Sequence, residues 1–283
     1  MSLVCLSDFE AYAKKHLPKV TWEYLAAGAD DSCTRDDNLR AYKRIRLRPC
    51  LLHDVSMIDT KTTILGTEIS FPVGIAPTGF HRLAWPSGEL STAKAAEAMN
   101  TCYIASTYAT CSMEEIVAAA PGGFRWFQLY IHRQRSASVQ LVRRAEALGF
   151  QAVVLTVDVP YPGKRRDDIR NNFQLPQHMS VKNFEGIFEI DALVEIKEAV
   201  RDKVEIYLDG GVRTGTDVLK ALALGAKCVF IGRPALWGLT YKGEEGLQEL
   251  LQILKDEFRL SMALTGCRNV SEIGRHLVQF PRL

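Results

Sequence analysis

The sequence predicts an α/β protein: an incomplete TIM-type (β/α) barrel in which six strands can be recognised in place of eight. Apolar runs alternate along the chain with segments of helical periodicity, which is the pattern of repeated βα units around a parallel sheet. The apolar runs are hydrophobic almost throughout, as expected for strands buried on both faces. Their spacing is regular except for one interval of double length, which locates the missing part.

Six runs have the length and composition of buried strands. They are FPVGIA from Phe71, TCYIAST from Thr101, FRWFQLYI from Phe124, QAVVLTVD from Gln151, VEIYLDGG from Val204 and KCVFIG from Lys227. Four intervals fit one βα unit each, whereas the interval from Gln151 to Val204 is about twice as long, and residues 159–203 contain no convincing buried strand. Because strand number, tilt and shear are linked, six strands cannot close as eight do. Either the fourth and fifth recognised strands pair in a smaller ring, or the sheet stays open.

Helical segments are expected before, between and after these strands. Ser7 and Glu10 have the spacing of a capping box at the start of an amphipathic N-terminal helix, and Ser112 and Glu115 have the same spacing before a helix that ends near Pro121. Further helices are predicted at residues 139–148, 191–200, 217–224, 243–264 and 270–280. The expected organisation is one domain with a helical lead-in (1–70), barrel units one to four (71–185), units seven and eight (190–240) and C-terminal helices (241–283).

Composition excludes several classes of protein. The 35 basic and 33 acidic residues give a net charge of +2, so nucleic-acid binding has no electrostatic support. No apolar run approaches the length of a membrane span, and the N-terminus lacks the apolar core of a signal peptide. The seven cysteines form no C-x-x-C pair, and we interpret them as reduced thiols rather than a disulfide framework or a metal site.

The chain ends in Pro281-Arg282-Leu283. A terminal tripeptide of small residue, basic residue and leucine, such as Ser-Lys-Leu, is a peroxisomal address. Proline departs from that pattern. The tripeptide is therefore either a degenerate address or an unstructured tail, and the residues alone leave both interpretations open.

The last two predicted strands end in glycine-rich turns that carry arginines. These turns contain Asp209, Gly210, Gly211 and Arg213 after one strand, and Gly232 and Arg233 after the next. Glycines let backbone N–H groups approach a phosphate, a following helix N-terminus adds positive potential, and arginine forms charge-assisted bonds to it. In TIM barrels a phosphate site commonly follows strands seven and eight. The pattern favours a phosphorylated ligand.

Polar groups also mark the ends of the first four strands. They are Pro77, Thr78 and Gly79 after the first, Ser106 and Thr107 at the second, Gln128 and Tyr130 in the third, and Thr156 and Asp158 in the fourth. Amide and hydroxyl groups that converge from strand ends suit a planar ring with several heteroatoms. Arg165, in the loop after the fourth strand, could bind a carboxylate. Of the six histidines only His81 and His132 fall near strand ends, and we interpret both as bystanders.

These residues together resemble the FMN-dependent 2-hydroxy-acid oxidases, the group of glycolate oxidase and the long-chain hydroxy-acid oxidases. The motifs that carry the resemblance are FPVGIAPTGF, FRWFQLYI, LTVDVPYPGKRRDDIRNNF, YLDGGVRTGTDVLKALALGA and FIGRPALWGL. The resemblance covers Leu6 to about Glu185 and about Ile190 to Leu283. It implies an (S)-2-hydroxy-acid oxidase that binds FMN, converts its substrate to a 2-oxo acid and reduces O2 to hydrogen peroxide. It also implies a peroxisomal homo-oligomer with no metal, membrane or nucleic-acid partner.

The resemblance assigns roles position by position. Pro77, Thr78, Gly79, Ser106, Gln128 and Thr156 resemble flavin contacts, and Asp209, Gly210, Gly211, Arg213, Gly232 and Arg233 resemble groups around the ribityl chain and phosphate. Tyr24 and Arg165 resemble the residues that hold the substrate carboxylate, and Tyr130 a tyrosine near the substrate hydroxyl. Tyr108 stands where some relatives have a tryptophan, which leaves side-chain preference open.

One part of the family pattern is missing. In the family, strand five ends in a lysine beside the flavin, and strand six ends in a Ser-Asn-His-Gly motif followed by an arginine. The histidine of that motif is the catalytic base, and the motif is absent from this chain. Loss of one contiguous piece indicates an alternative transcript or a mis-assembled gene. The alternative to an active oxidase is therefore a catalytically inactive truncated variant. A second alternative, another phosphate-binding barrel such as the inosine-phosphate dehydrogenase group, should show a catalytic loop cysteine, and no cysteine here has that context: Cys102 and Cys228 are at strand starts, and Cys267 is in the C-terminal cap.

Overall fold

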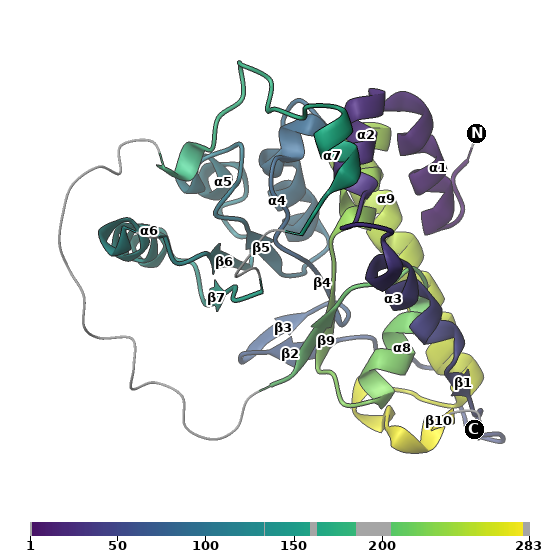
Figure 1. The fold of residues 1–283 in the computed structure, drawn as a ribbon. Helices are drawn as coiled ribbons and strands as arrows, with labels where there is room; N and C mark the ends of the chain where they lie inside the picture. Colours follow the sequence, from purple (N-terminus) through teal and green to yellow (C-terminus); the bar gives the residue numbers. More distant parts are fainter. Residues whose placement is uncertain (1, 133, 159–162, 185–204, 280–283) are drawn as a thin grey trace.

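The centre of the fold is one curved sheet of six parallel strands (Figure 1). The computed structural model describes residues 2–132, 134–158, 163–184 and 205–279. In spatial order the strands are β7 (Val153–Leu155), β6 (Arg125–Leu129), β5 (Tyr103–Ala105), β4 (Val73–Ile75), β9 (Cys228–Ile231) and β8 (Tyr207–Asp209). All six predicted strands are confirmed. β7 and β8 lie at opposite ends of the sheet, so the sheet is open and the direct pairing of the fourth and fifth recognised strands does not occur.

Helices pack around this sheet. They are α1 (Leu6–His16), α2 (Lys19–Ala26), α3 (Cys33–Lys43), α4 (Glu89–Ala98), α5 (Met113–Ala119), α6 (Arg135–Ala147), α7 (Arg166–Arg170), α8 (Gly215–Ala223) and α9 (Arg233–Thr265). α9 contacts α1, α4 and α8 and brings them together beside β9 and β4 (Figure 1). It is kinked at Lys242 and Gly243, where the glycine has φ of 59° and packs against Trp85. Within the described residues, no helix is long and apolar enough to cross a membrane.

The core has two layers, one on each face of the sheet. The outer layer lies between strands and helices and includes the fully buried Trp237 and Phe258 of α9. The inner layer includes Ile104, Trp126 and Phe230 on the concave face. A hairpin of β2 (Thr62–Ile64) and β3 (Thr67–Ile69) adds buried isoleucines to this inner layer.

Two predicted features of the chain ends are wrong. α1 begins at Leu6 without a side-chain cap on its N-cap residue, and Asp8 accepts a hydrogen bond from the Val4 N–H at 2.9 Å in place of a Ser7–Glu10 capping box. The predicted helix at residues 270–280 is instead the 3₁₀ turns η4 (Val270–Glu272) and η5 (Arg275–Leu277), followed by β10 (Val278–Gln279). β10 pairs with β1 (Arg46–Leu47), so a distant strand overrides the local helical pattern.

Other predicted helices are confirmed, with small changes at their ends. The Ser112 hydroxyl accepts from the Glu115 N–H at 3.1 Å, while the Glu115 carboxylate accepts from the Ser112 N–H at 2.7 Å. α8 starts two residues before its predicted start at 217, because Thr214 and Asp217 form a further capping box. The predicted helix at 191–200 lies outside the described residues.

The two end strands of the sheet expose apolar side chains. Val153 and Leu155 of β7 are 45% and 46% exposed, and Leu208 of β8 is 40% exposed. By contrast, every residue of β4, β5, β6 and β9 is buried. The opening of the sheet therefore lies between β7 and β8, while the pairing of β4 with β9 is intact.

Candidate active site

Two adjoining cavities lie at the carboxyl ends of the strands. The first, of about 330 Å³, lies at the ends of β4, β8 and β9, and we call it the β8–β9 cavity. The second, of about 500 Å³, lies at the ends of β5, β6 and β7, and we call it the β5–β7 cavity. They share Tyr24, Pro77, Gly79, Asp209 and Phe230. A ligand longer than either cavity could therefore extend through both.

Glycines form the floor of the β8–β9 cavity. Gly210 and Gly211 have φ values of 97° and 80°, a backbone region that residues with a side chain rarely adopt. A Cβ atom at Gly211 would lie 2.2 Å from the Asn38 carbonyl oxygen of α3, so the turn and this helix approach closely. Gly232 is the N-cap residue of α9, so the free N–H groups of this helix start beside the cavity.

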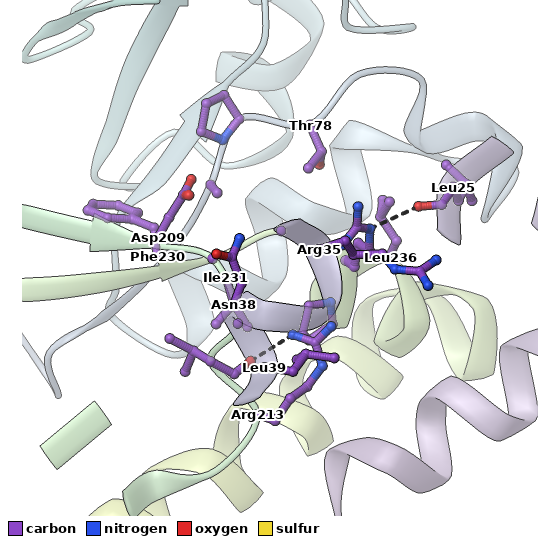
Figure 2. Close-up of a pocket in the computed structure, with 18 of the residues that line it drawn as sticks. Leu25, Arg35, Asn38, Leu39, Thr78, Asp209, Arg213, Phe230, Ile231 and Leu236 are labelled. Carbon is purple, nitrogen blue, oxygen red and sulfur yellow. Dashed lines mark hydrogen bonds between the residues drawn. The ribbon is translucent and has the colours of Figure 1, made fainter. Parts of the chain in front are cut away.

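Four arginines surround the same cavity: Arg35, Arg165, Arg213 and Arg233. Figure 2 shows Arg35 from α3 on one side and Arg213, after β8, on another. Arg233 donates to the backbone carbonyls of Leu25 and Ala27, each at 3.2 Å, and Arg213 donates to the carbonyl of its neighbour Val212 at 2.9 Å. Among the described residues, no carboxylate forms an ion pair with Arg213 or Arg233.

The positive charge of this cavity is poorly compensated. Burial lowers the pKa of Arg233, and the neighbouring Arg213, Arg35 and Arg165 lower it further. Burial also lowers the pKa of Arg213. A cluster of like charges that is partly removed from water is unfavourable unless an anion binds there. The turns, the helix N-terminus and the arginines together fit a phosphate group.

A connected set of polar groups lines the β5–β7 cavity. The Gln128 side-chain oxygen accepts from the Thr107 N–H at 3.0 Å and from the Ser106 hydroxyl at 3.4 Å, and its amide nitrogen donates to the Thr156 hydroxyl at 2.9 Å. These contacts join β5, β6 and β7 across the face of the cavity. The sequence prediction that Ser106, Gln128 and Thr156 converge is therefore confirmed.

Tyr24 and Arg165 lie together where the cavities meet. The Tyr24 ring stacks on Phe173 with 3.9 Å between centroids, and the Arg165 guanidinium lies 5.2 Å from the Tyr24 centroid. Arg165 also donates to the Tyr24 carbonyl oxygen and pairs with the Asp168 carboxylate. An incoming carboxylate would therefore have to share Arg165 with Asp168. Burial raises the pKa of Tyr24. The smaller effects of the nearby charges oppose each other, because Arg165 lowers this pKa and Asp168 raises it.

Tyr130 and Tyr108 form the outer wall of the β5–β7 cavity, with 5.5 Å between their ring centroids. Burial and the carboxylate of Asp158 raise the pKa of Tyr130, so its hydroxyl stays protonated at neutral pH. Tyr108 is 39% exposed, which leaves this wall open to solvent. The side chain at position 108 therefore contacts both the cavity and the solvent.

No described histidine lines either cavity. His81 is fully buried behind the Pro77–Gly79 turn. His132 lies beyond the end of β6, with 5.7 Å between its ring and that of Phe184. His53 and His276 line a separate cavity beside the C-terminal segment. The described histidines therefore do not face either cavity directly, although His81 contacts Thr78, which lines the first one.

The structure adds site residues that the sequence did not indicate. Arg35 and Asn38 of α3 line the β8–β9 cavity. Asn183 is fully buried and donates to the carbonyl oxygens of Ser106 and Thr107 at 3.1 and 3.3 Å, so it holds the end of β5. The charged α3 sequence CTRDDNLRAYK suggests only a solvated helix, and Asn183 lies in a polar loop, so neither position carries a local signal.

Comparison with known proteins places this site in a family. The model of the family described as FMN-dependent dehydrogenase matches residues 13–189 and 185–280. The chain is 50% identical to 2-hydroxyacid oxidase 2 of Bos taurus over 353 aligned positions, and 50% identical to the Homo sapiens protein of that name over 351; each alignment covers 100% of both chains. Among solved structures it resembles an oxidised active mutant of (S)-mandelate dehydrogenase, with a TM-score of 0.91, 28% identity, and coverage of 99% of this chain and 100% of the other.

The alignments also show where this chain is short. The bovine alignment has 353 positions and this chain has 283 residues, so at least 70 positions face a gap in this chain. The two segments of the family match meet at residues 185–189, between β7 and β8. A gap of this size corresponds to about two βα units. The family match over most of the chain and the relatives at 50% identity lead to one conclusion: the chain belongs to the family of FMN-dependent dehydrogenases.

Proposed function

We propose that this chain binds FMN in the two joined cavities and that its function is the oxidation of (S)-2-hydroxy acids to 2-oxo acids, with O2 reduced to hydrogen peroxide. The observation that carries the proposal is the group of four arginines beside two glycine turns and a helix N-terminus, in which Arg213 and Arg233 form no ion pair with a described carboxylate. FMN-dependent chemistry is the property of the family. The names of the relatives, 2-hydroxyacid oxidase and glycolate oxidase, support the substrate class.

The residues divide between the two ends of the cofactor. Arg213, Arg233, Gly211 and Gly232 would hold the phosphate, with Asp209 and Gly210 beside the ribityl chain. Pro77, Thr78, Gly79, Ser106, Gln128 and Thr156 would contact the ring. When bound, FMN supplies the two-electron acceptor that no protein side chain provides. The chain's own part is to fix the ring against the polar face made by Gln128 and its partners.

Tyr24, Tyr130 and Arg165 would bind the substrate. The Arg165 fork offers two parallel hydrogen bonds to a carboxylate. Tyr24 lies beside it, and its raised pKa keeps its hydroxyl available as a donor. Tyr130 lies on the opposite wall, within reach of a substrate hydroxyl. The exposed Tyr108 would contact the substrate side chain and so influence chain-length preference.

A second candidate function is a flavin-binding chain without significant turnover. The comparisons favour the oxidase at the level of the family, but one observation supports this second candidate: neither cavity is lined by a described histidine. Oxidation of a hydroxy acid requires removal of a proton, and a positioned base contributes about 10²–10⁴-fold to such a step. We propose that the base histidine is absent from this chain.

The visible absorption spectrum of the purified chain tests the proposal. A chain reconstituted with FMN and then desalted should keep the flavin absorbance bands, and free phosphate should compete with FMN. Loss of all flavin on desalting, with no saturable quenching of FMN fluorescence, would refute cofactor binding. A peroxide-coupled assay with glycolate, lactate and a long-chain 2-hydroxy acid then separates the two candidate functions.

We further propose that the chain is a peroxisomal homo-oligomer addressed by Pro281-Arg282-Leu283, which lies outside the described residues. A fusion with a fluorescent protein at its N-terminus, which leaves the C-terminus free, should give a punctate peroxisomal signal. Deletion of the last three residues should make that signal diffuse. An unchanged pattern after the deletion would show that the tripeptide is not the address.

A further inference from the structure

A buried polar network lies directly behind the Pro77–Gly79 turn. His81, Glu89 and Thr92 have no exposed surface. The His81 Nε2 is hydrogen-bonded to the hydroxyl of Thr78, and its Nδ1 is hydrogen-bonded to the hydroxyl of Thr92 at 2.8 Å. Thr78 in turn lines the β8–β9 cavity (Figure 2). Polar groups are buried at this density only when each is bonded, so the network fixes the geometry of the turn.

The contacts of Thr92 favour one tautomer of His81. The Thr92 hydroxyl has a single hydrogen, and the Gly88 carbonyl oxygen is available to accept it at 3.4 Å. A His81 with its N–H at Nδ1 lets Thr92 accept from the ring and donate to Gly88. Burial lowers the pKa of His81, which favours the neutral ring with one N–H. In this tautomer Nε2 has no hydrogen and accepts the hydroxyl hydrogen of Thr78.

This assignment determines what Thr78 presents to the cavity. Its one hydrogen is engaged by His81, so its oxygen offers only lone pairs to a ligand. The methyl group of Thr78 lies 3.3 Å from the point where a Cβ on Gly232 would be. The side chain is thus held between the imidazole on one side and the glycine at the start of α9 on the other.

Glu89 holds the backbone that carries His81. Its carboxylate accepts from the backbone N–H of His81 at 3.1 Å, from the backbone N–H of Thr110 at 2.8 Å and from the Thr110 hydroxyl at 2.6 Å. These bonds join the segment after β4 to the loop after β5. The backbone of His81 is therefore held in place by a buried carboxylate, and bonds of this kind are costly to leave unmade.

We propose that His81 is a positioning residue that acts through Thr78. It fixes the threonine hydroxyl as a hydrogen-bond acceptor that faces the cavity, where it receives an N–H or O–H of the bound cofactor. The inference rests on the FMN binding proposed above and deepens it by assigning a role to a residue outside the cavity wall. A buried histidine that only stabilised the core would not change the visible circular dichroism of bound FMN.

Two amide variants of the full chain separate the hydrogen bonds of His81. His81→Gln places a polar atom where Nε2 lies and keeps a partner for Thr78, whereas His81→Asn places one where Nδ1 lies and keeps a partner for Thr92. We expect His81→Leu and His81→Asn to weaken FMN binding about 3- to 10-fold, the size of one neutral hydrogen bond. His81→Gln should restore binding to within about twofold. Visible circular dichroism of bound FMN should follow the same order.

A double-mutant cycle with Thr78→Val supplies the decisive control. If His81 acts through Thr78, then His81→Leu should change neither FMN affinity nor the dichroism spectrum further in the Thr78→Val background. Additive losses, or equal behaviour of the Gln and Asn variants, would overturn the proposal. If His81→Leu does not fold, the Gln and Asn variants still decide. Absence of FMN binding by the unmodified chain would instead refute the proposed function.

Discussion

Replacement of Arg213 by methionine should change cofactor affinity and stability of the free protein in opposite directions. In the protein without ligand, the Arg213 side chain donates to the carbonyl oxygen of its neighbour Val212, and burial lowers its pKa against the smaller favourable effects of Glu10 and Asp217. Methionine keeps most of the aliphatic stem and removes the charge. The variant should therefore be as stable as the parent chain, or more stable, in the absence of FMN.

The expected loss of affinity follows from the kind of bond removed. A hydrogen bond to a charged partner is worth about 1.5–3 kcal/mol, which corresponds to a loss of FMN affinity of about 10- to 150-fold. Riboflavin lacks the phosphate and should bind the variant and the parent chain equally. Arg213 is a better test than Arg233, because Arg233 also holds the backbone of Leu25 and Ala27.

Fluorescence quenching of FMN and of riboflavin, with thermal unfolding of the protein free of flavin, measures both effects. Arg259→Met is the matched control, because Arg259 is exposed on α9, and this variant should leave both affinities unchanged. Unchanged FMN affinity in Arg213→Met would refute the assignment of the phosphate site. An equal loss of riboflavin affinity would show that the substitution damages the whole site and not the phosphate contacts.

Four further predictions concern other parts of the molecule. Asp168→Asn removes the carboxylate that pairs with Arg165, so binding of a simple carboxylate such as acetate, followed through the absorbance of bound FMN, should strengthen several-fold; weaker binding would contradict a substrate role for Arg165. Burial lowers the pKa of His81 from 6.5, so below pH 6.5 the unfolded chain takes up a proton that the folded chain does not. The free energy of unfolding should therefore fall by up to about 1.4 kcal/mol per pH unit below pH 6.5. Urea unfolding at pH 7 and pH 5 should show a smaller fall in His81→Gln than in the parent chain. The exposed end strands predict poor solubility and early proteolysis, and a sharp, high-temperature transition of a monodisperse sample would contradict this. Turnover in the peroxide-coupled assay should be at least about 10²-fold below that of an intact relative; activity within tenfold, abolished by His132→Ala, would instead identify His132 as a substitute base.

The strands and the phosphate turns could be predicted because their signals are local. Strands buried on both faces must be apolar along their whole length, and the six apolar runs coincide with the six strands of the sheet. A turn that places Gly210 and Gly211 at positive φ requires residues without a side chain, so the glycines themselves reveal it. The doubled interval between strands likewise located the opening between β7 and β8.

Features that depend on distant partners could not be predicted. Arg35 lies in a helix whose composition suggests a solvent-exposed segment, and it reaches the cavity only because α3 packs against the turn at Gly210 and Gly211. The β2–β3 hairpin turns at Leu65 and Gly66, and leucine at positive φ carries no turn signal. The residues of β10 have a helical pattern in the sequence, but their pairing with β1 decides their conformation.

The position of the opening explains why cofactor binding and turnover should separate in this chain. Loops after β8, β9 and β4 line the β8–β9 cavity, where we propose that the phosphate binds, and these three strands are neighbours in the sheet. The pairing of β4 with β9, which joins the first barrel strand to the last, is complete over three residue pairs. The gap relative to the relatives falls instead between β7 and β8, across the β5–β7 cavity from the phosphate turns. Loss of two βα units there would remove one wall of the proposed substrate site and leave the proposed phosphate site unchanged. We therefore expect that a preparation can be saturated with FMN and still turn over slowly, and that FMN affinity and turnover have to be measured separately.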